Sequence, residues 1–354
     1  MVENRRQFVN RAYLLVLILL LTACSALSPV APPPTPTPDV TVCASGCDFT
    51  TLQAAIDAES TASGDVIAVQ EAVHTEAAIV IHKSVTIQGN GADATIVQAD
   101  PQPETATERV FSIPDGVTVT LRALTIRHGN PHTTPESGGG VRNEGTLTVE
   151  NCLITANSGS AGGGIHNGGT LTAINTTISH NLARGGADAQ YECNTGGGIK
   201  DMEGLVTLRN STVSDNRAEG KGGGIHVACK GILVLENTVI RANSTLDDGG
   251  GVYIDGVGYF TRATLSANVA KTGGGVYLSG SGERNLIRGQ LNYTATLIAA
   301  NTAQMEKYGV ADCMFGDHAS LGANVNNWVG DGTCSPAHTG APTAVPRDIG
   351  ARGD

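Results

Sequence analysis

A glycine triplet followed by Val or Ile recurs along the 354-residue chain and constrains its fold more than any other feature. Between the triplets lie short stretches of alternating β-branched residues separated by Gly or Asn, and none carries a long apolar helical stripe. A unit of this size cannot bury its apolar face alone, so equivalent units must stack to form a core. The repeat therefore predicts a solenoid in which each unit is one coil of strands. The triplets begin at Gly138, Gly162, Gly196, Gly222, Gly249 and Gly273, at spacings of 24, 34, 26, 27 and 24 residues.

Three other repeat architectures fit the sequence less well. A leucine-rich repeat needs Leu-x-x-Leu-x-Leu before its Asn, whereas in Leu147-x-Val149-x-Asn151 the Asn comes too early. Calcium-binding repeats need a Gly-Gly motif about every nine residues, a period that is absent here, and a propeller blade of about 40 residues is too long. The spacing favours an all-β, parallel β-helix solenoid.

Asn residues recur at equivalent positions of successive units and support this stacking. Stacked Asn amides at the bends of parallel coils can hydrogen-bond to the coils on either side, which satisfies buried polar groups. An apolar residue stands three positions before each Asn, as Ile154 does before Asn157. We therefore expect an amide ladder along the solenoid. The main column is Asn157, Asn181, Asn216, Asn243, Asn268 and Asn301, and an earlier column is Asn151, Asn175, Asn210 and Asn237.

The two ends of the folded body are expected to close the solenoid. Residues 50–58 place Leu52, Ala55 and Ile56 on one face of a short N-terminal helix, which can cover the open edge of the first coil. We expect the β-helix to span residues 41–312 and a C-terminal closing segment to span residues 313–354.

The N-terminal residues predict export and a lipid anchor. Basic residues precede an apolar run that is too short to span a bilayer. The stretch from Leu21 to Cys24 resembles a bacterial lipobox, which implies that residues 1–23 are a signal peptide and that Cys24 is lipidated. Residues 24–40 then form a Pro-rich linker. We expect an extracytoplasmic lipoprotein exposed at the cell envelope, a monomer that contacts the membrane only through its lipid.

Cysteine content agrees with this compartment. The chain has eight cysteines, and removing Cys24 leaves seven in a location that permits disulfides. Cys152 is the unpaired one, and we interpret it as a small buried residue rather than a reactive nucleophile. The expected pairs are Cys43 with Cys47, Cys313 with Cys334, and Cys193 with Cys229.

The charge balance narrows the choice of partners. Lys and Arg total 22 against 33 Asp and Glu, which gives a net charge of −11, and no Lys/Arg block occurs. This composition argues against nucleic acid or an anionic membrane surface as the main partner. A neutral or locally recognised ligand is the simpler expectation.

Together these motifs resemble those of right-handed parallel β-helix proteins of the pectate-lyase-like fold. Gly-Gly-Gly-Ile-His and Asn-x-Ala pieces, such as Asn216-Arg217-Ala218, resemble polymorphic outer-membrane-protein repeats. The tail from Leu321 to Ala351 resembles the ending of choice-of-anchor type proteins. The resemblance implies the fold and a surface location, but no single activity, because this fold hosts lyases, hydrolases, epimerases and adhesins.

The residue after each GGG(I/V) motif gives the clearest functional pattern. Alternation along a strand points these residues outward on one face, and coils about 4.8 Å apart would place them in a row of roughly 24 Å. Tyr rings stack on sugar faces, and Arg, Lys or protonated His pair with uronate carboxylates. One hypothesis is that the row binds a polysaccharide or cell-surface glycan, as in an adhesin. The alternative is that these bulky residues only cover the groove between glycine-rich loops. The row is Arg142, His166, Lys200, His226, Tyr253 and Tyr277.

Acidic residues in the loops before the triplets suggest a second function. Calcium takes six to eight oxygen ligands, and carboxylates on adjacent coils can supply some of them. A calcium-assisted polysaccharide lyase of the pectate or alginate type would also need a base, for which Lys200 and Arg142 are the candidates. No compact set of Asp residues recurs at one column, so solvated acidic loops are the simpler interpretation. The candidate calcium ligands are Glu219, Asp247 and Asp248, beside Asp188 and Glu192.

Overall fold

The computed structural model describes most of the chain after the predicted linker. The described residues are 38–131, 138–185, 195–228, 230–279, 289–304, 312–316, 319–331 and 333–334. The predicted signal peptide, the lipidation site Cys24, the pair Cys193 and Cys229, and the acidic residues Asp188 and Glu192 lie outside these ranges. No helix in the described ranges has the length and apolar character needed to span a bilayer.

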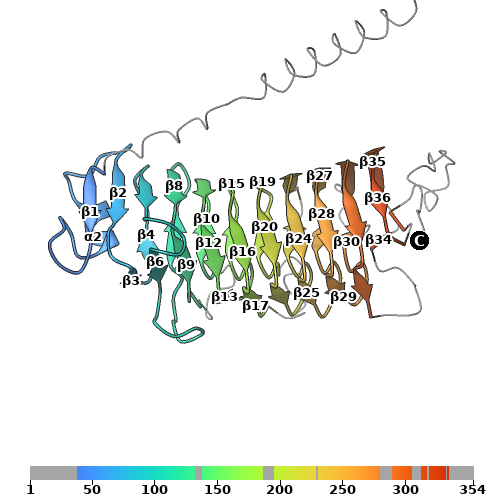
Figure 1. The fold of residues 1–354 in the computed structure, drawn as a ribbon, viewed down its shortest axis with the longest axis horizontal. Coiled ribbons are helices and arrows are strands. Elements are labelled where there is room, and N and C mark those ends of the chain that lie inside the picture. The colour runs from blue at the N-terminus through green and yellow to red at the C-terminus, as the bar shows by residue number, and fades with distance from the viewer. Residues whose placement is uncertain are drawn as a thin grey trace, which may run out of the picture. The chain divides into compact units, whose positions relative to one another are not determined.

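Short parallel strands stack along one axis and form four sheets, A to D (Figure 1). Sheet A contains β1 (Val40–Val42), β2 (Val66–Val69), β5 (Thr86–Gln88), β8 (Thr118–Arg122), β11 (Thr146–Glu150), β15 (Thr170–Ile174), β19 (Leu205–Arg209), β23 (Ile232–Glu236), β27 (Val257–Thr261), β31 (Gln290–Thr294) and β35 (Ser320–Val325). Sheet B contains β3 (Val73–Thr75), β6 (Ile96–Gln98), β9 (Thr125–Arg127), β12 (Leu153–Thr155), β16 (Thr177–Ser179), β20 (Thr212–Ser214), β24 (Val239–Arg241), β28 (Thr264–Ser266), β32 (Leu297–Ala299) and β36 (Trp328–Val329).

The other two sheets lie on the remaining sides of the coils. Sheet C contains β4 (Ile79–Val80), β7 (Phe111–Ile113), β10 (Val141–Asn143), β14 (Ile165–Asn167), β18 (Ile199–Met202), β22 (Ile225–Ala228), β26 (Val252–Ile254), β30 (Val276–Leu278) and β34 (Cys313–Phe315). Sheet D contains β13 (Ser158–Gly159), β17 (Leu182–Ala183), β21 (Arg217–Ala218), β25 (Ser244–Thr245), β29 (Val269–Ala270) and β33 (Thr302–Ala303). A full coil passes through A, B, D and C in turn, as β11 to β14 show, so the chain forms a parallel β-helix.

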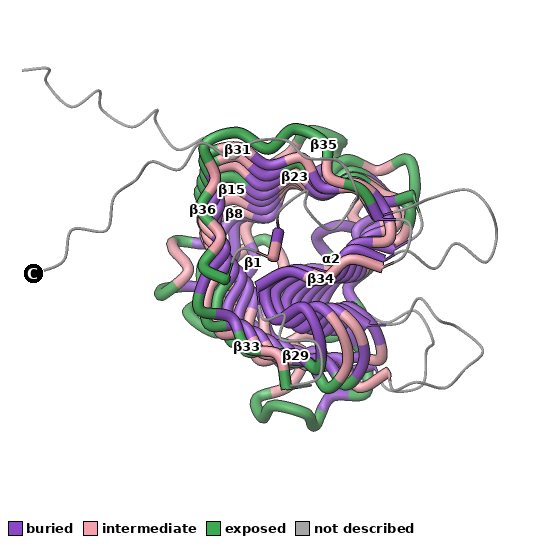
Figure 2. Tube along the Cα trace, turned by 90° about the vertical axis from the view of Figure 1, so that its right-hand side faces the viewer, coloured by how far each residue is buried: buried purple, intermediate pink, exposed green. Residues whose placement is uncertain are grey.

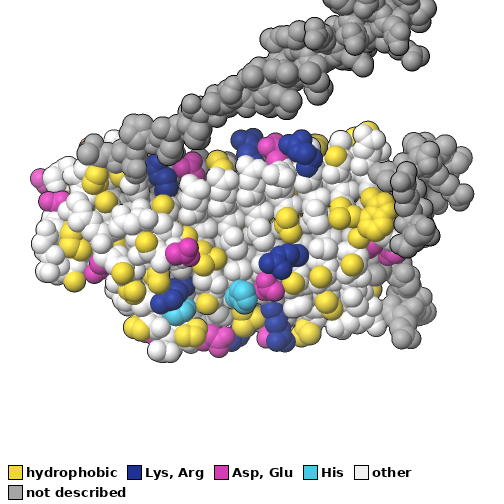
Figure 3. Space-filling view, viewed as in Figure 1, with side chains coloured by type: hydrophobic (Ala, Val, Ile, Leu, Met, Phe, Trp, Pro, Cys, Tyr) yellow, Lys and Arg dark blue, Asp and Glu magenta, His cyan; other side chains and the backbone are white. Residues whose placement is uncertain are grey.

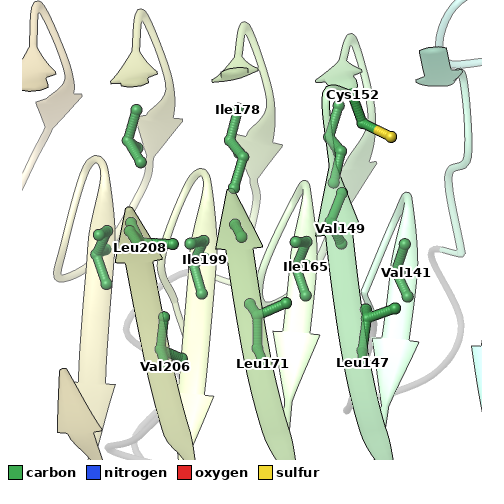
Figure 4. Packing of buried hydrophobic residues seen from close by; sticks show 14 of the residues in the cluster. Val141, Leu147, Val149, Cys152, Ile165, Leu171, Ile178, Ile199, Val206 and Leu208 are labelled. Carbon is green, nitrogen blue, oxygen red and sulfur yellow. The ribbon is translucent and has the colours of Figure 1, made fainter. Parts of the chain in front are cut away.

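The core is built from the same positions of each coil. Leu147 on β11 lies beside Leu171 on β15, and Val141 on β10 lies beside Ile165 on β14. Figure 4 shows these side chains directed into the space between the sheets, and all four are fully buried. Because every second residue of a strand points to the same side, the period-two pattern of the sequence builds this core directly.

The predicted Asn ladder is present. Each side-chain amide donates from Nδ2 to Oδ1 of the Asn one coil further along, at 2.9–3.0 Å from Asn157 to Asn301. At the C-terminal end, Asn301 donates to Oδ1 of Asp312 at 2.8 Å. In the earlier column, Asn151, Asn175, Asn210 and Asn237 have φ values of 49–53°, the left-handed conformation that Asn tolerates better than most residues.

The glycine triplets are explained by close approach of two backbones. A Cβ on Gly163 would lie 2.5 Å from the carbonyl oxygen of Leu182 in β17, and one on Gly164 would lie 2.7 Å from that of Gly198. The first glycine of the triplet, Gly162, also has a positive φ of 60°. Only glycine fits where the chain passes from sheet D into sheet C.

The N-terminal end of the solenoid contains the expected capping helix. Helix α2 (Leu52–Asp57) buries Leu52, Ala55 and Ile56, as predicted, and its N-cap Thr51 accepts a hydrogen bond from Ala54. At the other end β34, β35 and β36 add one more strand to three of the sheets. The predicted closing segment thus begins as a further coil.

Two of the expected disulfides are confirmed, Cys43–Cys47 and Cys313–Cys334. Cys152 is a buried thiol, as predicted. Its burial raises the pKa to about 11, so the thiol stays protonated at neutral pH.

Candidate functional site

The six residues that follow the GGG(I/V) motifs form one row in register. Each lies opposite its counterpart on the next strand of sheet C, from β10 to β30. The predicted alignment is therefore present. The pairs are Arg142 with His166, His166 with Lys200, Lys200 with His226, His226 with Tyr253, and Tyr253 with Tyr277.

The expectation that this row is an exposed stripe is wrong for four of its members. His166, Lys200, His226 and Tyr253 are each at most 2 % exposed, and only Arg142 and Tyr277 are partly exposed. Alternation does point the row away from the main core. However, sheet D lies beyond the outer face of sheet C, as the end view of β29, β33 and β34 shows (Figure 2). The row is thus largely enclosed in a second, smaller layer.

A lysine, a histidine and an aspartate meet in the middle of the row. Nζ of Lys200 lies 3.2 Å from Nδ1 of His226, and Nε2 of His226 lies 3.7 Å from Oδ2 of Asp255. Complete burial, reinforced by the charge of Lys200, lowers the pKa of His226 to about 3. Burial also lowers the pKa of His166 to about 3, with the Lys200 charge adding to the effect. Both imidazoles are therefore neutral at pH 7, and neither can pair with an anion as a cation.

The C-terminal half of the row is aromatic. The rings of Tyr253 and Tyr277 stack with their centroids 5.1 Å apart and an angle of 3° between their planes. The ring of His226 meets that of Tyr253 edge-on, with the centroids 4.9 Å apart. The ammonium of Lys221 lies 4.8 Å from the centre of the Tyr253 ring. Burial and the charge of Asp248 raise the pKa of Tyr277 to about 12. We call Lys221, Asp248, Tyr253 and Tyr277 the tyrosine cluster.

The N-terminal end of the row carries a surface ion pair. Nε of Arg142 lies 2.9 Å from Oε1 of Glu144, and both side chains are about one-third exposed. A cation paired in this way presents less net charge to an anionic ligand.

The candidate calcium ligands differ in how far they are buried. Glu219 is exposed, whereas Asp247 and Asp248 are half-buried. Burial, with the charge of Asp247 next to it, raises the pKa of Asp248, and its carboxylate accepts a hydrogen bond from Thr272. Within the described ranges, no group of three or more His, Cys, Asp or Glu side chains is arranged to hold a metal. Calcium binding stays a prediction.

A second polar ladder was not predicted. Asn143 donates to Asn167, and Asn167 donates to Asp201, at 2.7 Å in each case. Asp201 is fully buried, and burial raises its pKa to about 7 against the opposing effects of Asn167 and Lys200. The sequence signal that could have revealed this ladder is the third residue after each of three triplets, in Val-Arg-Asn, Ile-His-Asn and Ile-Lys-Asp.

Comparison with known proteins identifies the family. Residues 73–291, more than half of the chain, match the right handed beta helix region family. The chain belongs to the right-handed β-helix family. The predicted fold class, an all-β right-handed parallel β-helix with a short capping helix, is therefore confirmed. The narrower likeness to polymorphic outer-membrane-protein repeats and choice-of-anchor proteins stays a prediction. No curated protein matches the sequence.

Solved structures with a similar fold share little sequence with this chain. A pectin methylesterase from carrot is 14 % identical, with a TM-score of 0.42 over 82 % of this chain and 90 % of that one. The pectate lyase Pel9A is 15 % identical, with a TM-score of 0.48 over 78 % of this chain and 72 % of that one. YbhC from Escherichia coli is 15 % identical, with a TM-score of 0.39 over 87 % and 90 %. At these identities the likeness concerns the fold alone.

Proposed function

We propose that this protein is a lipid-anchored β-helix of the bacterial envelope that binds a glycan at the tyrosine cluster. The observation that carries the proposal is the stacked pair Tyr253 and Tyr277, of which Tyr277 is partly exposed. Aromatic faces stack on the apolar faces of sugar rings, and the neighbouring Lys221 and Asp248 offer charged partners for hydroxyl or carboxylate groups. The proposed glycan-binding surface is therefore the aromatic end of the row rather than the whole row.

The lipid anchor and the choice of partner rest on separate observations. The sequence from Leu21 to Cys24 supports the anchor. On the face drawn in Figure 3, Lys and Arg are interspersed with Asp and Glu and form no continuous basic patch. This distribution suits a glycan better than a nucleic acid.

Changing Cys24 to Ala tests the lipid anchor. Without a lipidated cysteine, the protein is expected to move from the membrane fraction to the soluble fraction.

Binding of a panel of pectic, alginate and neutral polysaccharides to the full chain, measured by calorimetry, tests the glycan proposal. Tyr277→Ala is expected to weaken binding about tenfold, because a lost aromatic contact is worth about 1.4 kcal/mol. Tyr259→Ala is the matched control, since Tyr259 is 46 % exposed on β27 of sheet A. Equal losses in the two variants, or no binding to any polymer, would overturn the proposal.

A calcium-assisted polysaccharide lyase is the second candidate, favoured by the contact between Lys200 and His226. In its neutral form, a lysine amine is the type of group that can act as a base. Its complete burial is the argument against this function. Ultraviolet absorbance of unsaturated products with pectate or alginate and calcium tests it. Product formation that disappears with a chelator and in Lys200→Ala, but not in the exposed control Lys230→Ala, would make the enzyme the better assignment.

A further inference from the structure

His74 sits between two carboxylates at the N-terminal end of the solenoid. It lies on β3 and is 3 % exposed. Its Nδ1 is 2.5 Å from Oε1 of Glu71, and its Nε2 is 2.7 Å from Oε2 of Glu76. Ionised carboxylates only accept hydrogen bonds, so both ring nitrogens must carry a proton to donate. The geometry is therefore that of an imidazolium held by two anions.

The same two carboxylates also hold the N-terminal cap, which we define as residues 43–57. Glu76 accepts hydrogen bonds from the backbone amides of Leu52 at 2.6 Å and Gln53 at 3.0 Å, at the start of α2. Glu71 accepts one from the amide of Ala44 at 3.2 Å, inside the loop closed by the Cys43–Cys47 disulfide. The His74 ring thus links the helix and the disulfide loop to the first coils.

We propose that protonated His74 is a pH-sensitive latch that fastens the N-terminal cap to the solenoid, and that the cap opens as the pH rises. Loss of one ring proton would leave a nitrogen lone pair facing a carboxylate at hydrogen-bond distance. The two groups then repel, and Glu71 or Glu76 must move away from the ring. Either movement breaks hydrogen bonds between a carboxylate and the backbone amides of the cap.

The charges around the ring set the direction of the effect. Burial alone would lower the pKa of His74, but the hydrogen bonds and charges of Glu76 and Glu71 outweigh it and raise the pKa above its usual range. These two carboxylates are the charged groups that act on the ring; α2 contributes backbone amides, and β6 places the apolar Val97 opposite. The stabilisation is full below the unfolded pKa of about 6.5 and is lost as the pH rises through the raised folded value.

The opening should stay local. In a solenoid each coil contacts mainly its neighbours, so stability is divided along the axis. His74 bonds to Glu71 and Glu76, which hold the cap, whereas the Asn ladder of the central coils contains amides that do not titrate in this range. A rise in pH is therefore expected to open residues 43–57 as a local event, separate from the effect of the buried Asp201 on the coils around it.

Hydrogen–deuterium exchange of the full chain between pH 6 and pH 9, corrected for the intrinsic rate, tests the latch. Peptides covering residues 44–57 are expected to lose protection at least tenfold as the pH rises, while peptides covering residues 290–299, several coils beyond Asp201, keep theirs. A cap whose protection does not change with pH would overturn the proposal.

Two variants separate the latch from general weakening of the cap. His74→Gln removes the cation, and its cap is expected to be unprotected throughout this pH range. Glu71→Gln is the more informative change, because the new amide can donate to Nδ1 of a neutral His74 while its oxygen still accepts from Ala44. That cap is expected to stay protected at pH 9. If Glu71→Gln opens with the same pH profile as the unchanged chain, His74 is not the latch.

Discussion

In the central coils, residues 138–304, the same polar side-chain contacts repeat from coil to coil, whereas in the N-terminal coils, residues 38–131, the stabilising polar contacts differ from one coil to the next. The central coils share an inner Asn ladder and glycine triplets packed on sheet D. The N-terminal coils have no described strand in sheet D and depend on a disulfide, a capped helix and the His74 clamp. Repetition lets one amide stabilise two neighbouring coils, while an irregular coil needs a side-chain arrangement of its own.

The largest effect is expected from breaking the ladder in its middle. Asn216 accepts from the side chain and backbone of Asn181 and donates to Ile178 and Asn243. Asn216→Ala would leave these buried groups without partners, which we expect to lower the free energy of unfolding by about 3–5 kcal/mol. Urea denaturation measures this loss.

Asn237→Ala is the matched control for that change, because Asn237 belongs to the outer column and is exposed. Its loss is expected to stay below about 1 kcal/mol, since Ala occupies the equivalent left-handed position at Ala295. Similar losses in the two variants would mean that the inner ladder is no more important than the outer one.

The second polar ladder gives a pH-dependent test within the central coils. Asp201 has a folded pKa of about 7, raised from 3.8, so its contribution to stability is full below pH 3.8 and is lost as the pH rises through 7. Asp201→Asn cannot ionise and should be more stable than the unchanged chain at pH 8, by on the order of 2–4 kcal/mol. At pH 4 the difference should be small.

Urea denaturation at the two pH values measures the Asp201 effect. Asp215→Asn, a change at an exposed carboxylate, serves as the control and should have little effect at either pH. A gain for Asp201→Asn that is the same at pH 4 and pH 8 would contradict the assignment of a buried titrating carboxyl.

The smallest effect is expected in the N-terminal cap. Thr51→Ala removes the side-chain hydrogen bond to Ala54 at the start of α2, which we expect to cost about 1 kcal/mol. Exchange protection of α2 measures it, and Thr50→Ala next to it is the control. If protection of the central coils fell to the same degree, the cap and the central coils would unfold as one unit rather than separately.

The sequence predicted the stacking of the repeat and, from local patterns, the capping helix and two disulfides. It did not predict which side chains are covered or which meet between coils. The register of the row from Arg142 to Tyr277 and the Asn ladder follow from aligning equivalent positions. The burial of Lys200 and His226 could not be predicted in this way, because alternation indicates which side of a strand a residue faces but not what covers that side. Sheet D consists of two-residue strands, too short to recognise by their pattern.

The irregular coil shows the same limit. Glu71, His74 and Glu76 lie where no repeat marks equivalent positions, so nothing in the sequence indicated that they meet around one ring. Asp255 and Lys221, beside the row, could have been found only by knowing how the loops fold back on sheet C.

The Asn ladder has a direction, because each side-chain amide donates to the oxygen of the Asn on its C-terminal side. The amide dipoles therefore add along the axis, with the positive end at Asn301, where the carboxylate of Asp312 receives the last hydrogen bond. A negative group at the positive end of aligned dipoles is the arrangement that stabilises helix N-termini. An Asn can accept and donate at once, whereas a carboxylate only accepts. Duplication of an internal coil would thus preserve the ladder, and Asp312 marks the point beyond which it cannot be extended.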